Sequence, residues 1–317
     1  MLYLRTVCGP VEVGSLALIL PHEHVFTDLR APDTPGFGQA CIGDVVAVMR
    51  PHLEAARAAG VSAIIECTPL GVGRNVRALR ALAEATSFPI VASAGAYREP
   101  FMPQWVREAS EQALMRWLRQ ELCVGIDDTD IVGGLIKLAC NDPMTPAEAK
   151  LLRAASRVGA ELGVAIACHT PSGRLALEEL GIVTGEGFPV ERFVWVHAQN
   201  ESDMGLHREL ASRGCYVEFD GIAEEADLNA YIDWISALFR ADLQDRVLIS
   251  QDAGWYCPGE PGGGQIRPYD FLPRRFLPLL RANGFSEGDI RLLTVENVAR
   301  AFGCEQRGGE DWRQRAG

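Results

Sequence analysis

The chain alternates short apolar runs rich in β-branched residues with longer segments that carry apolar side chains at helical spacing. Runs of the first kind predict buried strands, and segments of the second kind predict amphipathic helices. The predicted strands are 16–22, 61–67, 89–94, 130–138, 164–169, 192–197, 215–219 and 246–252. The predicted helices are 44–60, 75–86, 104–123, 146–162, 172–180, 202–213, 228–241 and a set from about residue 269 to the C-terminus.

This alternation predicts a parallel sheet, and eight such units within 317 residues predict a (β/α)8 barrel, or TIM barrel. A doubly wound sheet is the rival, but no G-x-G-x-x-G motif follows the first predicted strand. Residues 2–13 alternate around Gly9-Pro10, which predicts a short N-terminal β-hairpin. Because no Ser/Gly-rich linker divides the chain, we expect residues 1–317 to form a single domain.

Residues with metal-binding side chains lie at or near the ends of five of the predicted strands. Two histidines follow the first apolar run one residue apart, so on a strand both side chains point the same way. The carboxyl ends of barrel strands meet at one mouth, so all six side chains are expected to converge there and to hold metal. The six residues are His22, His24, Lys137, His169, His197 and Asp252.

Most of these residues also have a purely structural explanation. His169 or His197 alone would be interpreted as a hydrogen-bonded core histidine, and Asp252 as a helix N-cap. Lys137 is harder to explain, because it lies in an apolar run and a buried ammonium needs partners or a strongly lowered pKa. A lysine amine that carries CO₂ as a carbamate would instead be an oxygen ligand able to bridge two cations.

Composition narrows the choice of partners. Hydrophobic residues make up 48% of the chain and the formal net charge is −12. An acidic balance argues against nucleic acid and an anionic membrane surface as partners. No apolar run is long enough to span a bilayer, and the N-terminus lacks the pattern of a signal peptide. The nine cysteines show no C-x-x-C spacing and fit free thiols, so we expect a cytoplasmic protein.

Several segments resemble the phosphotriesterase family of the amidohydrolase superfamily, which includes aryldialkylphosphatases and phosphotriesterase-like lactonases. The resemblance covers nearly the whole chain. It rests on residues 20–24, 66–75, 136–137 and 295–302, together with His169, His197 and Asp252.

The resemblance implies a binuclear metal centre. His22, His24 and Asp252 would hold the more buried ion, and His169 and His197 the more exposed one. Carboxylated Lys137 and a hydroxide would bridge the two divalent ions, expected to be zinc, with manganese, cobalt or iron as alternatives. The hydroxide would attack the substrate, and Asp252 would take up its proton.

The loops suggest a small-molecule substrate with a carbonyl ester, above all a lactone. The organophosphate hydrolases of the family carry a histidine where this chain has Gly221, so little or no phosphotriesterase activity is expected. Tyr97 matches a tyrosine of the lactonases or is a rim aromatic, and Trp255 and Arg267 flank a glycine-rich loop that suits a substrate lid. An amidase acting on N-acyl compounds, a phosphotriesterase and a catalytically weak binding protein are the alternatives, and a homodimer remains an option.

The seventh loop carries four carboxylates and no basic residue between residues 220 and 227. If these carboxylates face the substrate, they disfavour an anion. A phosphorylated substrate would need an arginine clamp, for which Arg74, Arg98 and Arg267 come singly from other loops. We therefore predict that neutral lactones or esters are preferred over phosphorylated analogues.

Overall fold

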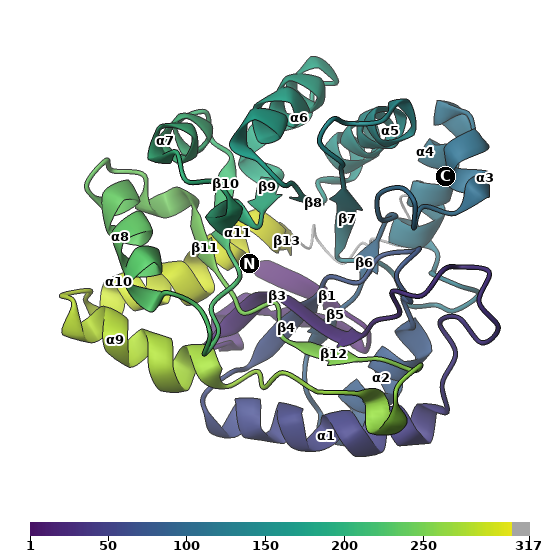
Figure 1. Ribbon diagram of the computed structural model, residues 1–317, viewed down its shortest axis with the longest axis horizontal. Helices are drawn as coiled ribbons and strands as arrows, with labels where there is room; N and C mark the ends of the chain where they lie inside the picture. Colours follow the sequence, from purple (N-terminus) through teal and green to yellow (C-terminus); the bar gives the residue numbers. More distant parts are fainter. Residues whose placement is uncertain (306–317) are drawn as a thin grey trace.

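Short parallel strands form a ring at the centre of the fold, and helices surround it (Figure 1). The computed structural model describes residues 1–305. Around the ring the strands are β3 (Ile19–Phe26), β4 (Ala63–Glu66), β5 (Ile90–Val91) continued by β6 (Ser93–Ala94), β7 (Leu135–Ala139), β8 (Ile166–His169), β9 (Phe193–Val196), β10 (Tyr216–Phe219) and β11 (Val247–Ile249). The ring closes where the Asp252 amide donates to the His22 carbonyl over 3.1 Å. The predicted (β/α)8 barrel is confirmed.

Most of the helices cover the outside of the ring, and the last one packs against the cluster inside it. They are α1 (Ile42–Ala58), α2 (Val76–Thr86), α3 (Gln104–Glu108), α4 (Glu111–Cys123), α5 (Pro146–Leu162), α6 (Gly173–Gly185), α7 (Met204–Ser212), α8 (Leu228–Phe239), α9 (Leu277–Ala282), α10 (Glu287–Arg291) and α11 (Asn297–Phe302). Their ends follow local sequence signals: α5 begins with a capping box of Thr145 and Glu148 and ends at Gly163 with φ 66°. Within residues 1–305, no helix is long and apolar enough to cross a bilayer.

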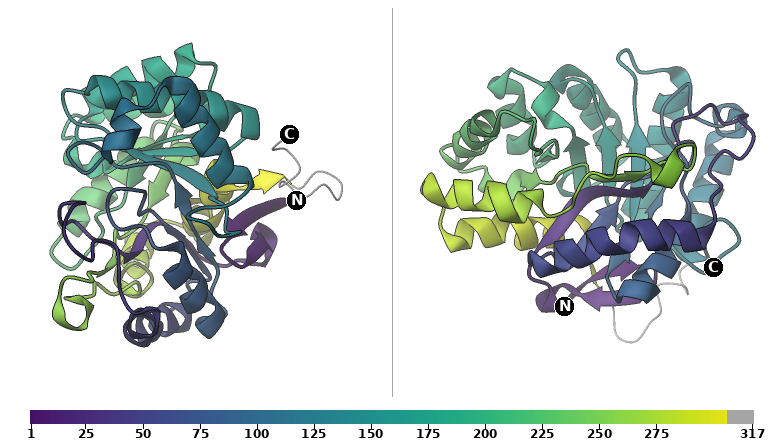
Figure 2. Two further views of the ribbon diagram at one scale, coloured as in Figure 1. Left: turned by 90° about the vertical axis from the view of Figure 1, so that its right-hand side faces the viewer. Right: turned by 60° about the horizontal axis from the view of Figure 1, so that its bottom comes forward.

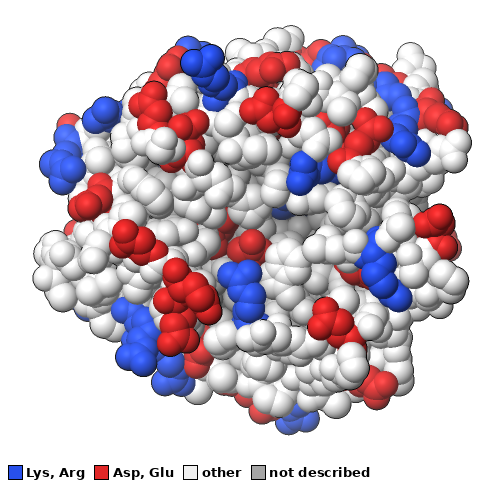
Figure 3. Space-filling model, in the orientation of Figure 1, with Lys and Arg blue, Asp and Glu red and all other residues white. Residues whose placement is uncertain are grey.

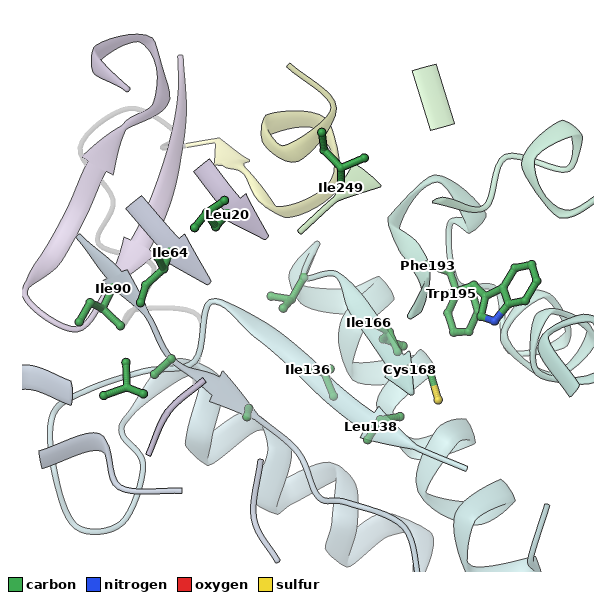
Figure 4. Close-up of a cluster of buried hydrophobic side chains, with 14 of the residues drawn as sticks. Leu20, Ile64, Ile90, Ile136, Leu138, Ile166, Cys168, Phe193, Trp195 and Ile249 are labelled. Carbon is green, nitrogen blue, oxygen red and sulfur yellow. The ribbon is translucent and has the colours of Figure 1, made fainter. Parts of the chain in front are cut away.

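Alternate residues of each strand serve two different cores. The side chains that point outward, among them Leu20, Ile64, Ile136 and Trp195, pack between the ring and the helices (Figure 4). Residues at the intervening positions, such as Ile65, form a second buried cluster inside the ring. Lys137 lies between the outward-facing Ile136 and Leu138 on β7, so its side chain belongs to the inner face. The two-residue period of the strand therefore directs this lysine into the barrel.

The predicted N-terminal hairpin is present as β1 (Leu2–Thr6) and β2 (Gly9–Glu12). It gains a third strand that the sequence did not predict, β13 (Cys304–Glu305), which pairs antiparallel with β1. Figure 2 shows the hairpin and β13 together on one side of the barrel.

Several predicted boundaries need correction. The strand predicted over 130–138 begins only at Leu135, and the helix predicted over 172–180 continues to Gly185. The first strand continues past the histidine pair to Phe26, because β12 (Gly254–Tyr256) pairs with its second half. The predicted helix 104–123 is interrupted near Ser110, whose side chain accepts from the Ala113 amide and begins α4. The predicted C-terminal helices end at Phe302, and residues 306–317 lie outside the described part of the chain.

Candidate metal centre

The six residues that the sequence predicted as metal ligands line one pocket of about 130 Å³ at the mouth of the barrel. Three of them come from within strands: His22 and His24 from β3, and Lys137 from β7. His169 is the last residue of β8, His197 follows β9, and Asp252 lies three residues after β11. His197 and Asp252 both have a left-handed backbone, with φ of 64° and 49°. This conformation is uncommon for residues other than glycine and is often found at functional sites.

The four imidazole rings form a continuous row. Ring centroids are 5.3 Å apart between His24 and His22, 5.1 Å between His22 and His197, and 4.5 Å between His197 and His169. Asp252 meets one end of the row, because its Oδ1 lies 3.0 Å from Nε2 of His24 and 4.0 Å from Nε2 of His22. The structure therefore brings together all the histidines and the carboxylate that the sequence singled out.

The electrostatics of the pocket favour the protonation states that metal binding requires at His24, His169 and Asp252. Burial lowers the pKa of His24 to about 4, and burial together with the neighbouring His197 lowers the pKa of His169 well below its ordinary value. Burial also opposes ionisation of Asp252, but the adjacent imidazoles, that of His24 foremost, outweigh it and lower the pKa of that carboxyl. Near neutral pH this leaves His24 and His169 neutral beside a carboxylate. His22 differs, because burial there is outweighed by its neighbours Cys67, Asp220 and Glu218, which raise its pKa.

Lys137 is 2% exposed, and its Nζ donates to the Leu138 carbonyl over 3.1 Å. Within residues 1–305, no carboxylate oxygen lies within 4.0 Å of this ammonium. A buried lysine without a counter-ion is costly as a cation. Carboxylation would replace the positive charge with a negative oxygen ligand that faces the same pocket, so the residue fits a bridging role.

The donor set passes a simple test of fit for divalent cations. Ligand atoms of His22, His24 and Asp252 all lie within 4.8 Å of one another. Oδ1 of Asp252 is buried and accepts no hydrogen bond from any residue in the described part of the chain. Mixed imidazole nitrogen and carboxylate oxygen ligands suit zinc and its first-row neighbours. These residues could therefore hold an ion.

The sequence did not reveal a layer of polar residues behind the histidines. His24 Nδ1 donates to Thr68 Oγ1 over 2.7 Å, and that hydroxyl donates to Glu66 Oε1 over 2.5 Å. His22 Nδ1 donates to Glu218 Oε2 over 3.1 Å. An imidazole whose Nδ1 carries the proton presents the lone pair of Nε2. One signal was available: Glu218 lies in β10 and Asp220 directly follows it, and side chains two residues apart on an extended strand point to the same face.

Two charged residues interpreted as loop groups are buried instead. Asp220 is 0% exposed and accepts from His197, so it cannot face an incoming substrate as the sequence interpretation required. Arg74 forms two ion pairs in the interior: its Nη2 lies 2.6 Å from Glu121 Oε1 and 3.1 Å from Asp127 Oδ1. Arg74 therefore ties its own loop to α4 and is unavailable as a phosphate clamp.

The three residues predicted to bind substrate divide between two pockets. Tyr97 and Trp255 line the metal pocket. The Tyr97 hydroxyl is 3.3 Å from His169 Nδ1, and the Trp255 ring centroid is 4.7 Å from that of His24. Arg267 instead lines a second pocket of about 160 Å³, together with Glu224 and Glu225. Both pockets border the segment around Asp252, and side chains of both charges surround a central hollow on this face (Figure 3).

The barrel and the cluster at its mouth define the class, a hydrolase of the amidohydrolase type. The profile of the phosphotriesterase family matches residues 2–302, and the chain belongs to this family, as the sequence resemblance predicted. It is 29% identical to the phosphotriesterase homology protein of Escherichia coli (strain K12), covering 89% of this chain and 97% of that protein.

Two further comparisons differ in the activity that they name. The chain is 27% identical to the N-acetyltaurine hydrolase of Dictyostelium discoideum, covering 94% of this chain and 96% of that protein. Its structure superposes on a mutant of the PTE-like lactonase of Deinococcus radiodurans with a TM-score of 0.86 and 29% identity, covering 95% of this chain and 100% of that one. The family is therefore shared by proteins named for amide and for lactone hydrolysis.

Proposed function

We propose that the protein is a metal-dependent hydrolase that cleaves a carbonyl ester, foremost a lactone, and has little or no activity on phosphotriesters. The observation that carries the proposal is the single pocket in which the buried His22, His24 and Lys137 meet His169, His197 and Asp252. Two divalent cations, zinc before manganese, cobalt or iron, would supply water activation and polarisation of the scissile carbonyl.

The residues of the chain then have separate roles. His22, His24 and Asp252 would hold one ion, His169 and His197 the other, and carboxylated Lys137 would bridge them. Asp252 would also accept the proton released during attack, since it is ionised and borders the pocket. Trp255 and Tyr97 would bury the reacting group, because both aromatic rings line the same pocket.

The substrate extends beyond the metal pocket in this proposal. A pocket of about 130 Å³ holds little more than the reacting group, and the second pocket of about 160 Å³ offers space for the rest. Arg267 and the two glutamates there would contact a polar substituent. Similarity to a PTE-like lactonase and the position of Tyr97 support the lactone.

An amidase acting on an N-acyl compound is the second candidate. Similarity to N-acetyltaurine hydrolases over most of the chain favours it, and the same metal site could serve an amide. Side-by-side kcat/KM values on aliphatic lactones, aryl esters and N-acetyl amino compounds decide between the two. A higher value for the lactone supports the first candidate, and a higher value for the amide supports the second. Metal binding without turnover of any would favour a binding protein.

The proposal also includes the domain organisation, the cellular compartment and the oligomeric state of the protein. We place residues 1–317 in a single hydrolase domain. All nine cysteines are free, and five of them are buried, which supports a reducing compartment such as the cytoplasm. A homodimer is included in the proposal and can be checked by light scattering of the purified protein.

A further inference from the structure

Asp220 contacts two histidines of the pocket at once. Its Oδ1 accepts from His197 Nδ1 over 2.6 Å, and its Oδ2 lies 3.3 Å from His22 Nδ1. The carboxylate follows directly after β10, between the strand that precedes His197 and the strand that closes on His22. One side chain is thus shared by two rings that the proposed function assigns to different ions.

The carboxylate is held firmly in this bridging position. Oδ1 also accepts from Gln199 Nε2 over 2.7 Å, and Oδ2 accepts from the His197 amide over 2.9 Å. The Asp220 amide donates back to Gln199 Oε1 over 3.2 Å. Asp220 is 0% exposed, so water cannot replace these partners. A movement of the Asp220 carboxylate away from one of these partners therefore also changes its distances to the others.

The other contacts behind the histidines each serve one ring. Thr68 bonds only His24 among the four histidines, and Glu218 bonds only His22, according to the contacts found within residues 1–305. An outer carboxylate or hydroxyl fixes the tautomer and orientation of the imidazole that it contacts. Asp220 alone does so on both sides of the pocket.

We propose that Asp220 is a positioning residue that couples the two metal positions, so that its loss weakens both ions together. The inference rests on the proposed function, because it requires His22 and His197 to be ligands. In Asp220→Asn an NH2 group replaces one carboxylate oxygen. This NH2 cannot accept a hydrogen bond from a ring N–H or from the His197 amide. If the NH2 takes the place of Oδ1, His197 Nδ1 loses its acceptor. If it takes the place of Oδ2, the His197 amide loses its acceptor and His22 Nδ1 keeps only Glu218.

The test follows zinc release from the loaded protein with a chromogenic chelator, which gives an apparent affinity for each of two ions. Asp220→Asn is expected to weaken both, each by about 10–100-fold, the usual effect of losing an outer partner. Thr68→Val is the matched control, because it removes an acceptor from His24 only and should weaken a single ion. The visible spectrum of the cobalt-loaded protein should change at both positions in Asp220→Asn and at one in Thr68→Val.

Selective loss of one ion in Asp220→Asn would overturn the coupling. If that variant fails to fold, Gln199→Leu decides, because it removes a donor to Asp220 from a half-buried position and should weaken both ions in parallel. A change confined to one ion in Gln199→Leu contradicts the inference equally. Failure of the proposed function looks different, since the wild-type protein itself would then release fewer than two ions.

Discussion

Nε2 of His24 lies 3.0 Å from Oδ1 of Asp252, although the first residue belongs to the first barrel strand and the second follows the last. The contact depends on ring closure, in which the Asp252 amide donates to the His22 carbonyl. The left-handed backbone of Asp252 turns its side chain toward the histidines. The pairing that closes the barrel therefore also brings Asp252 to the histidines.

Asp252 is expected to act both as ligand and as proton acceptor. Asp252→Asn keeps the shape and one oxygen of the side chain but removes its basicity. Turnover should fall by roughly 10²–10⁴-fold while much of the bound metal remains. Steady-state kinetics and metal analysis of the same sample check this. Wild-type turnover in the variant would assign the proton to another group.

Lys137 is expected to be carboxylated when metal is bound. Lys137→Ala should lose both metal and activity, because no other described side chain of the pocket reaches from β7 into it. Short carboxylic acids such as acetate or propionate should restore part of the activity by supplying the missing bridge. Full activity with unchanged metal content in Lys137→Ala would end the binuclear assignment.

Neutral substrates are expected to be preferred over phosphorylated analogues of the same ring. Glu224 and Glu225 are exposed at the pocket of Arg267, and Arg74 is buried in its ion pairs. The net charge around this pocket is therefore still negative and disfavours an anionic substrate, although Asp220 does not contribute to this charge. The kcat/KM value of the neutral compound should exceed that of its phosphorylated analogue, and added salt should reduce the ratio of the two values.

The double substitution Glu224→Gln and Glu225→Gln should further reduce the preference in kcat/KM for the neutral substrate, because it removes two negative charges and leaves Arg267 in place. A phosphorylated substrate that is preferred tenfold by the wild-type protein would show instead that Arg267 dominates the pocket.

Glu179 should make stability depend on pH. The fully buried carboxyl on α6 accepts from Thr170 Oγ1 over 2.7 Å, and burial raises its pKa from 4.5 to about 7. The folded state holds this proton more tightly than the unfolded state. The stabilisation is therefore complete below pH 4.5 and is lost as the pH rises through about 7.

Glu179→Gln removes this titration. Between about pH 5 and about pH 8 its free energy of unfolding in urea should fall less than that of the wild type, by roughly 1–3 kcal/mol. Glu178→Gln, on the exposed side of the same helix, is the matched control and should keep nearly all of the wild-type slope, because Glu178 raises the pKa of Glu179 less than burial does. Equal slopes for Glu179→Gln and the wild type would show that Glu179 does not hold the proton.

The sequence could predict the barrel and six of the residues that line the pocket, because both follow from local patterns. Strands and helices have distinct periods, and barrel topology brings the strand ends together. The extent of the first strand could not be predicted, since Phe26 pairs with Tyr256 from the far end of the chain. Asp220 was wrongly expected to face the substrate with the other carboxylates of the seventh loop, because it directly follows a predicted strand. Its role depends on two histidines from other strands, which no local pattern contains.

Metal content measured together with activity tests the central claim most directly. The protein should be purified, its metal counted by mass spectrometry, its activity on a neutral lactone and an N-acetyl compound recorded, and both measurements repeated after chelation and after return of zinc. The account predicts two divalent ions per chain, loss of hydrolysis on chelation and recovery on return of the metal. Hydrolysis that survives complete removal of metal would contradict it.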